Sequence, residues 1–431
     1  MTISAGIPAA SAPIVREKAI RRDLKAPIAL DVFALVTLLL AFAAPRAGES
    51  TFMLSASGDA IQIPPIVAAS TVVVTVIAIV LAVLAVLAHL YSARGATGKV
   101  PIWLIAVFGV LFLVAFLAWA ASGERPVQVP GLLVGALALS TPIIFGALGG
   151  VIGERAGVVN VAIEGQLLLG AFSAAFVGSI THSAVLGLIA AMVGSVLVSF
   201  VLATFAIRYI VDQVIVGVVL NVLVSGLTSF LYSKVLTSNP EQFNSTDRFP
   251  QLPIPGLSEI PILGPVFFRQ TIIVYLMYVA VFLVWFGLYK TRWGLRVRAV
   301  GEHPTAADTV GINVNRTRFW TVALAGAVAG IGGAYFTLDA VSSFNKDMTN
   351  GLGFIALAAV IFGRWHPLQA TLAALLFGFA TNLQSSLGII GSPVPAEFML
   401  MLPYIVTIFA VAGLVGTSRA PAADGKPYIK S

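Results

Sequence analysis

The stretch GALGGVIGERAGVVNVAIEGQLLLGAF, residues 146–172, is an apolar sequence interrupted by a Gly cluster and by charged side chains. Glu154 and Arg155 adjoin at the interruption, and Asn160 and Glu164 follow within apolar sequence. Ionisable groups are costly inside a bilayer and usually face the interior of a helix bundle or an aqueous path. The stretch therefore indicates an interrupted membrane segment whose polar groups avoid lipid.

The rest of the chain has the composition of a membrane protein. Of its 431 residues 58% are hydrophobic and only 10% are charged, whereas a soluble domain is roughly 45–50% apolar. A helix that crosses a bilayer needs about 20 mostly apolar residues. The fold class is therefore an all-α polytopic membrane protein of about 10–12 transmembrane helices. We expect helices near residues 26–44, 65–91, 101–121, 131–151, 159–180, 184–207, 214–236, 271–289, 319–338, 353–363, 368–390 and 397–415.

Several functional classes are excluded by composition. The chain has no cysteine, so it can form neither disulfides nor thiolate metal sites. Its four histidines are scattered, and no His-Glu-x-x-His or Gly-x-Ser-x-Gly motif occurs, which disfavours a metal site and an intramembrane enzyme. The net charge of +7 comes from Lys and Arg in tails and short loops, a pattern that reports membrane topology and not nucleic-acid binding.

The positions of Lys and Arg predict the topology, because cytoplasmic loops carry an excess of both. We expect both termini in the cytoplasm and the Pro-rich loop 237–270 over the outer mouth. The N-terminus is expected to be a tail and not a cleavable signal, since the first apolar run is long and has no evident cleavage site. The expected organisation is a cytoplasmic tail (1–25), additional N-terminal transmembrane helices (26–130), a core (131–415) and a cytoplasmic C-terminal tail (416–431).

A second interrupted segment, GLGFIALAAVIFGRWHPLQATLAALLFGF, occupies residues 351–379. Aligned with the first, it places Arg155 over Arg364 and Asn160 over Gln369. Paired interrupted segments in two halves of a chain are typical of transporters with internal repeats, and they point to the substrate path.

Residues 290–318, KTRWGLRVRAVGEHPTAADTVGINVNRTR, form a polar island between two apolar runs. Pro304 suits a first helical position and Gly311 can end the turn, so a short helix is expected in this loop. Isolated helices below about 12–15 residues are marginal in water, so this one is expected to dock on something. The alternative is an ordinary structured loop.

The run GLRVRAVGEHPTAADTVGINVNRTRF resembles the long cytoplasmic loop in permease subunits of bacterial ABC importers for branched-chain amino acids, simple sugars and nucleosides, and is most similar to the nucleoside permeases. The two interrupted segments resemble the same group, and the similarity covers roughly residues 131–415. It implies a coupling helix that docks on a separate ATPase, with Glu302 and Asp308 facing basic groups of that partner. The implied coupling residues are Glu302, His303, Pro304, Ala306, Ala307, Asp308 and Gly311.

The resemblance also implies the partners. The chain lacks a Gly-x-x-x-x-Gly-Lys-Ser/Thr motif, so no cofactor is expected in it, and ATP and Mg²⁺ belong to the ATPase subunit. A second permease subunit, of a different sequence, an extracellular substrate-binding lipoprotein and the lipid of the bacterial cytoplasmic membrane complete the expected partners.

Polar residues in apolar spans are the candidates for contact with the solute. Glu164, with Asn160 one helical turn before it, offers groups suited to ribose hydroxyls; the alternative is that both tie broken backbone together. Other polar candidates can equally be interhelical hydrogen bonds, and the flanking aromatics Phe145, Phe172 and Trp365 can be packing. Arg155 and Arg364 are expected to anchor helix ends. The full set of candidates is Asn160, Glu164, Asn221, Phe354, Asn382 and Gln384.

Two alternatives remain open. A simple sugar or a branched-chain amino acid is as compatible with the family resemblance as a nucleoside. An ion-coupled secondary transporter would need more paired intramembrane carboxylates than the solitary Glu164, and it leaves the polar island unexplained.

Overall fold

The computed structural model describes residues 24–56, 58–59, 61–94, 100–409 and 419–430. Most of the predicted N-terminal tail lies outside these residues, as do residues 416–418 of the predicted C-terminal tail. The chain divides into two compact units, Met1–Pro45 with Thr71–Phe116, and Arg46–Ser70 with Leu117–Ser431.

The first unit is built from three apolar helices, α1 (Lys25–Phe42), α2 (Ser70–Arg94) and most of α3 (Ile102–Ala120). Their contact is made by small and branched side chains, including the fully buried Leu81 and Leu104. Asp31 of α1 accepts a hydrogen bond of 2.7 Å from Nε2 of His89 on α2. The three runs predicted from hydropathy are thus helices.

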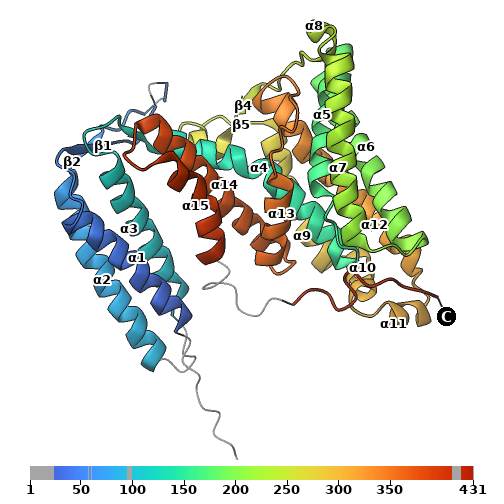
Figure 1. The fold of residues 1–431 in the computed structure, drawn as a ribbon, viewed down its shortest axis with the longest axis horizontal. Helices are drawn as coiled ribbons and strands as arrows, with labels where there is room; N and C mark the ends of the chain where they lie inside the picture. Colours follow the sequence, from blue (N-terminus) through green and yellow to red (C-terminus); the bar gives the residue numbers. More distant parts are fainter. Residues whose placement is uncertain (1–23, 57, 60, 95–99, 410–418, 431) are drawn as a thin grey trace, which may run out of the picture. The chain divides into compact units, whose positions relative to one another are not determined.

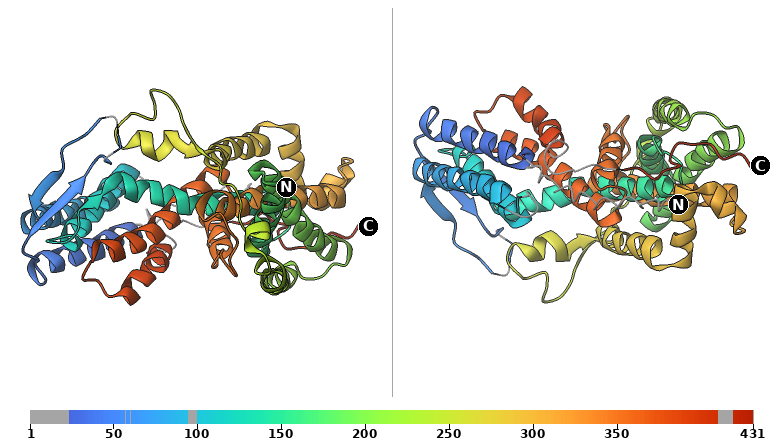
Figure 2. Two further views of the ribbon diagram at one scale, coloured as in Figure 1. Left: turned by 90° about the horizontal axis from the view of Figure 1, so that it is seen from above. Right: turned by 90° about the horizontal axis from the view of Figure 1, so that it is seen from below.

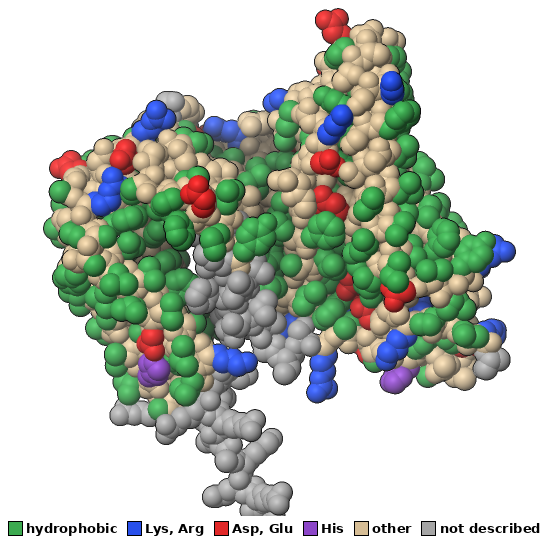
Figure 3. All heavy atoms as spheres, in the orientation of Figure 1, with side chains coloured by type: hydrophobic (Ala, Val, Ile, Leu, Met, Phe, Trp, Pro, Cys, Tyr) green, Lys and Arg blue, Asp and Glu red, His purple; other side chains and the backbone are tan. Residues whose placement is uncertain are grey.

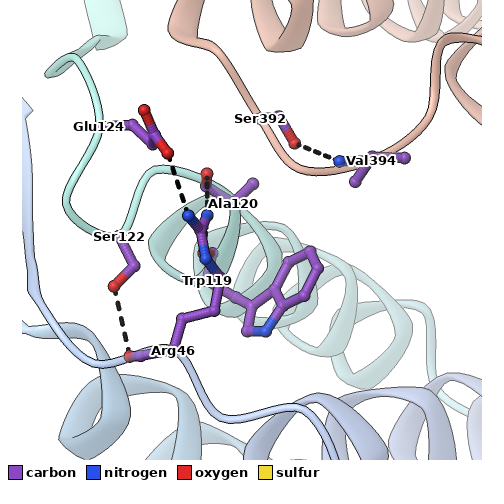
Figure 4. A network of polar contacts seen from close by, with 7 residues as sticks. All are labelled: Arg46, Trp119, Ala120, Ser122, Glu124, Ser392 and Val394. Carbon is purple, nitrogen blue, oxygen red and sulfur yellow. Dashed lines mark hydrogen bonds and ion pairs between the residues drawn. The ribbon is translucent and has the colours of Figure 1, made fainter.

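A small sheet, which the sequence did not predict, belongs to the second unit. Strand β1 (Glu49–Met53) pairs antiparallel with β2 (Ile66–Ala69) and parallel with β3 (Val127–Gln128). Beside it, the Arg46 guanidinium donates to the carbonyl of Ala120 (3.0 Å) and to Oε1 of Glu124 (3.0 Å), and lies over the Trp119 ring (Figure 4). The predicted helix 65–91 therefore begins later, at Ser70, because residues 66–69 pair with β1.

The larger part of the second unit is helical. Its elements are α4 (Val129–Arg155), α5 (Ile163–Thr181), α6 (Ala184–Ala203) with the π-turn η1 (Thr204–Arg208), α7 (Gln213–Leu231) with η2 (Tyr232–Leu236), α8 (Pro240–Phe243), β4 (Gln251–Pro253), η3 (Gly264–Phe268), β5 (Arg269–Thr271), α9 (Ile272–Lys290), α10 (Arg292–Glu302), α11 (Pro304–Thr309), α12 (Val314–Tyr335) with η4 (Phe336–Ala340), α13 (Leu352–Phe362), α14 (Pro367–Ile390) and α15 (Ala396–Phe409).

Two layers of packing hold these helices together. α4 packs against α12, α13 and α14, and α5 packs against α6, α7 and α12. Glycines permit the closest approaches: a Cβ on Gly333 of α12 would lie 2.3 Å from the carbonyl oxygen of Leu167 on α5. Small residues are common at helix contacts in membrane proteins. The hydrophobic effect does not drive helices together in lipid, so their association depends on the close packing that small residues permit.

The second unit has two distinct ends. The hairpin of β4 and β5 lies with α8 at one end, and α10 and α11 lie at the other (Figure 1). Figure 2 looks along this direction from above and from below, and parts of the green helices are seen end-on. Hydrophobic side chains cover much of the face drawn in Figure 3. The end with α10 and α11 contains the polar island, whose cytoplasmic location stays a prediction.

Ten described helices have the length and apolar composition to cross a bilayer, which confirms the polytopic fold. The run predicted as a span at 353–363 is wrong as a span: α13 has 11 residues and rises only about 16 Å, roughly half the hydrocarbon thickness. The last predicted run corresponds to α15, and its residues 410–415 lie outside the described chain.

Candidate functional site

The break between α4 and α5 comprises residues 156–162. Asn160 lies in this break and is fully buried, so it does not share a helix face with Glu164 as its spacing predicted; α5 begins only at Ile163. Its Nδ2 donates to Oε1 of Gln166 (3.0 Å), and Gln166 in turn donates to Oγ of Ser199 on α6 (2.9 Å). The Asn160 amide therefore ties the break to α5 and α6.

Helix α7 supplies further partners for the broken backbone. Oδ1 of Asn221 accepts from the N–H of Gly165 (2.8 Å), and its Nδ2 donates to the carbonyl of Val161 (2.9 Å). Oε1 of Gln213 accepts from the N–H of Val159 (2.7 Å). Non-helical backbone at membrane depth is tolerated only where such groups satisfy it, so Asn221 supports the break.

The Glu164 carboxylate links the two interrupted segments. Oε1 accepts from the Thr349 hydroxyl (2.6 Å) and from the N–H of Gly351 (2.8 Å), and Oε2 accepts from the N–H of Gly353 (2.7 Å). Gly351 is the N-cap of α13 and itself offers no side chain. A residue of the first turn of α5 thus caps α13.

This capping carboxylate stands at the N-termini of two helices at once, since Glu164 is in the first turn of α5 and bonds the first turn of α13. Unpaired N–H groups and the helix dipole make such termini favourable for negative charge. A Cβ on Gly353 would lie 2.4 Å from the backbone nitrogen of Glu164, so only glycine permits this approach. The side chain is half-buried, and Oε2, which accepts one bond where Oε1 accepts two, retains acceptor capacity.

At their other ends the two segments also meet. Arg155, the last residue of α4, donates from Nε to the carbonyl of Trp365 (2.8 Å) and from its Nη2 to the carbonyl of Arg364 (3.3 Å). The Trp365 indole N–H donates to the Glu154 carboxylate. Burial and the nearby Arg155 cation lower the pKa of His366 in the same turn. The α4 end thus fixes the turn between α13 and α14.

The predicted correspondence of the two segments is only partial. Each contains a break after a helix, and Arg155 contacts the turn that contains Arg364. Asn160, however, is fully buried whereas Gln369 is exposed near the start of α14, so these two residues have different environments.

The remaining solute candidates differ in exposure. Nδ2 of Asn382 donates to the carbonyl of Leu132 (2.7 Å) and joins α14 to α4, at the edge of a pocket of about 420 Å³. Gln384 is half-buried, and its side chain makes no hydrogen bond with a described residue. The Phe354 ring is 49% exposed. Among the flanking aromatics, Phe145 is buried in the core, and Phe172 packs edge-on against Phe344.

The polar island folds into α10 and α11. Val300, Ala307 and Val314 form its small buried core. Gly301 of α10 touches the end of α4: a Cβ there would lie 2.2 Å from the carbonyl oxygen of Arg155. The predicted short helix therefore exists, at Pro304–Thr309, and Gly311 has the left-handed φ of +86° that ends it. His303 and Ala306 are exposed.

The C-terminal segment, residues 419–430, lies along α10 and α11 (Figure 1). Oε2 of Glu302 accepts from the N–H of Ala422 (3.1 Å), and Asp308 is 3.9 Å from Nζ of Lys430. The two carboxylates predicted to face a partner therefore contact this segment.

Two residues that the sequence reasoning missed hold the C-terminal segment. Arg318, 1% exposed, donates to the carbonyls of Ala156 (3.1 Å) and Lys426 (2.9 Å). Asp424 lies close to Arg318, and burial raises the pKa of its carboxyl to about 7. The signal for Arg318 was its position at the start of an apolar run, but it was counted with the loop cations.

Comparison with known proteins identifies the family to which the chain belongs. The family described as "Branched-chain amino acid transport system / permease component" matches residues 132–411. The guanosine ABC transporter permease protein NupQ of Bacillus subtilis is 43% identical over 323 residues, 70% of this chain and 98% of that protein. The nucleoside ABC transporter permease protein NupC of Lactococcus lactis is 40% identical over 68% and 95%.

A putative glucose ABC transporter permease protein, TsgC13 of Haloferax volcanii, is 38% identical over 258 residues, 59% of this chain and 77% of that protein. No solved structure matches the chain.

Proposed function

The chain belongs to the branched-chain amino acid transport permease family and is a membrane permease subunit of an ABC importer, not an enzyme; on this premise we propose that it imports nucleosides. The observation that carries the proposal is the similarity to a guanosine permease along 98% of that protein. The glucose permease is matched less completely, so a sugar is the second candidate.

The proposed mechanism is alternating access driven by an ATPase that docks at α11 and the turn before it. Exposed residues of α11 and its preceding turn, His303 and Ala306 among them, are the contact surface. Gly301 then transmits the movement, because it lies against the end of α4 without an intervening side chain. From there Arg155 reaches the turn between α13 and α14. ATP and Mg²⁺ are bound by the ATPase.

The family implies an ATPase and a substrate-binding protein as partners. We further propose that the other half of the pathway is a second, different permease, and that the binding protein is an extracellular lipoprotein. The membrane is the bacterial cytoplasmic membrane, with both termini and α10–α11 on its inner side.

For the solute we propose contact with Phe354 and Gln384, since Phe354 is exposed and the Gln384 side chain makes no hydrogen bond with a described residue. An aromatic face suits a base ring. Asn160, Asn221 and Asn382 are already engaged with backbone or neighbouring side chains. Glu164 positions α13 by accepting hydrogen bonds from the N–H groups of Gly351 and Gly353.

The experiment is uptake of radiolabelled guanosine, adenosine, uridine, ribose and glucose by cells that differ only in this gene. ATP depletion and a proton uncoupler at constant ATP are separate arms. We expect loss of nucleoside uptake in the deletion strain, sensitivity to ATP depletion and indifference to the uncoupler.

Three results would contradict the proposal. Loss of glucose or ribose uptake with nucleosides unaffected would assign a sugar. Uptake that collapses with the proton gradient at constant ATP would contradict ATP-driven import. An apparent affinity equal to that of wild type in both Phe354→Ala and Gln384→Ala would mean that neither residue contacts the solute. The control is Phe267→Ala, which changes an exposed residue of η3.

A further inference from the structure

A groove of about 930 Å³ runs between α10, the turn after α11 and the first turns of α12. Three arginines line it, Arg292 and Arg296 on one face of α10 and Arg316 on α12. None of the described residues that line it is acidic, and none of the three guanidinium groups forms an ion pair with a described side chain. The groove thus concentrates unneutralised positive charge.

The groove is also apolar along its walls. Leu295 is 62% exposed and Val310 is 75% exposed, and the indoles of Trp293 and Trp320 lie in the same lining. Trp320 is held edge-on against Phe200 of α6, with ring centroids 6.3 Å apart. Such exposed apolar groups are unfavourable in water, so the groove has the composition of a surface that something amphipathic covers.

Charge and aromatic groups are separated along α12. Arg316 is in the first turn, and Trp320, four residues later on the same face, lies about 6 Å further into the helix. That helix is one of the ten that can cross the bilayer. The groove therefore presents cations near the membrane surface and an indole deeper, which is the order of headgroup and acyl chain in a phospholipid.

We propose that this groove is a binding site for an anionic phospholipid, whose phosphate contacts Arg292, Arg296 and Arg316 and whose acyl chains lie over Trp320 and Leu295. A soluble ATPase is a poorer occupant, because the groove extends into a membrane-spanning helix. The inference depends on the membrane fold and is independent of the solute transported. It assigns α10, next to the docking helix α11, a second contact with lipid.

The test is native mass spectrometry of the full-length protein in detergent, titrated with dioleoyl phosphatidylglycerol or with dioleoyl phosphatidylcholine. The triple variant R292Q/R296Q/R316Q removes the site. The control R208Q/K290Q/R364Q removes three exposed cations that do not line the groove. A basic residue near an anionic membrane surface contributes roughly 5-fold to affinity, so the first phosphatidylglycerol should bind about 100-fold more weakly to the triple variant.

Wild type should prefer phosphatidylglycerol to phosphatidylcholine by at least about 10-fold, and the control should keep that preference. Equal affinity of wild type for the two lipids, or an unchanged affinity in the triple variant, would overturn the proposal. Displacement of the lipid by millimolar glycerol phosphate would identify a site for soluble phosphate instead. Loss of ATPase assembly in the triple variant, with its preference for phosphatidylglycerol intact, would make the groove a protein interface.

Discussion

Glu164→Gln tests whether one carboxylate holds the two interrupted segments together. Glutamine keeps one acceptor oxygen but turns the other acceptor into an NH₂ donor, which then faces a backbone N–H of α13. The wild-type bonds from Thr349, Gly351 and Gly353 are 2.6, 2.8 and 2.7 Å long. Losing one charge-assisted bond costs about 1.5–3 kcal/mol, and losing the charge at the α13 N-terminus costs about 0.3–1 kcal/mol.

The variant should therefore weaken the start of α13 by about 2–4 kcal/mol. Hydrogen exchange followed by mass spectrometry measures this directly on a peptide covering residues 349–356. If local opening governs exchange, the amides of Gly351 and Gly353 should exchange about 30-fold faster or more. Glu241→Gln is the matched control, because Glu241 is exposed on α8.

Unchanged exchange at Gly351 and Gly353 in Glu164→Gln would refute the capping role. Uptake kinetics then separate the two readings of this residue. Altered apparent affinity with unchanged exchange would mean that the carboxylate meets the solute; faster exchange with a lower rate and unaltered relative preference among solutes would mean that it positions α13.

Three further variants test the supports of the site. Asn221→Val should lower the thermal midpoint, because a buried Gly165 N–H is left unpaired at a cost of about 1–3 kcal/mol; an unchanged midpoint would place its partners elsewhere. Glu302→Lys with Asp308→Lys should abolish ATP-driven uptake with insertion intact, since both carboxylates hold segment 419–430; normal uptake would remove these residues from coupling. Burial raises the pKa of Asp424 to about 7, above its ordinary 3.8, so its contribution to docking of the segment is present below about pH 4 and lost as pH rises through about 7. After correction for the intrinsic pH dependence of amide exchange, a peptide covering residues 419–430 should exchange hydrogen faster at pH 8 than at pH 5.5, and Asp424→Asn should abolish that difference; equal pH dependence in the variant would mean that another group titrates.

Hydropathy predicted the spans because bilayer thickness fixes helix length, and α4, α5 and α14 are where apolar runs placed them. It failed where tertiary pairing decides structure. Residues 66–69 are apolar enough for a helix, yet they pair with β1. For α13, the predicted run 353–363 already had the 11 residues of the observed helix, so its length should have excluded it as a span.

The sequence indicated candidate residues for the site, but it did not reveal which partners they bind or what they do there. A carboxylate within apolar sequence must have partners, and Glu164 does, but Thr349 and Gly351 are 185 and 187 residues away and spacing cannot name them. The same holds for Arg318, whose partners Ala156 and Lys426 are 162 and 108 residues away along the chain. Local spacing also misled, because the i, i+4 relation assumed for Asn160 holds only inside a helix.

The contacts around the end of α4 explain how a loop can act on the membrane segments. With 27 residues, α4 is a rod of about 40 Å, and its last carbonyl, at Arg155, touches Gly301 where no Cβ would fit. A displacement of α10 would therefore be transmitted to the backbone of α4 directly, because no flexible side chain lies between the two helices at this contact. The Arg155 side chain then holds the turn at Trp365, and α13, which leads into that turn, is held at its other end by Glu164. Because α13 is too short to cross the membrane and is held at both ends, we expect a movement of α4 to change the tilt of α13.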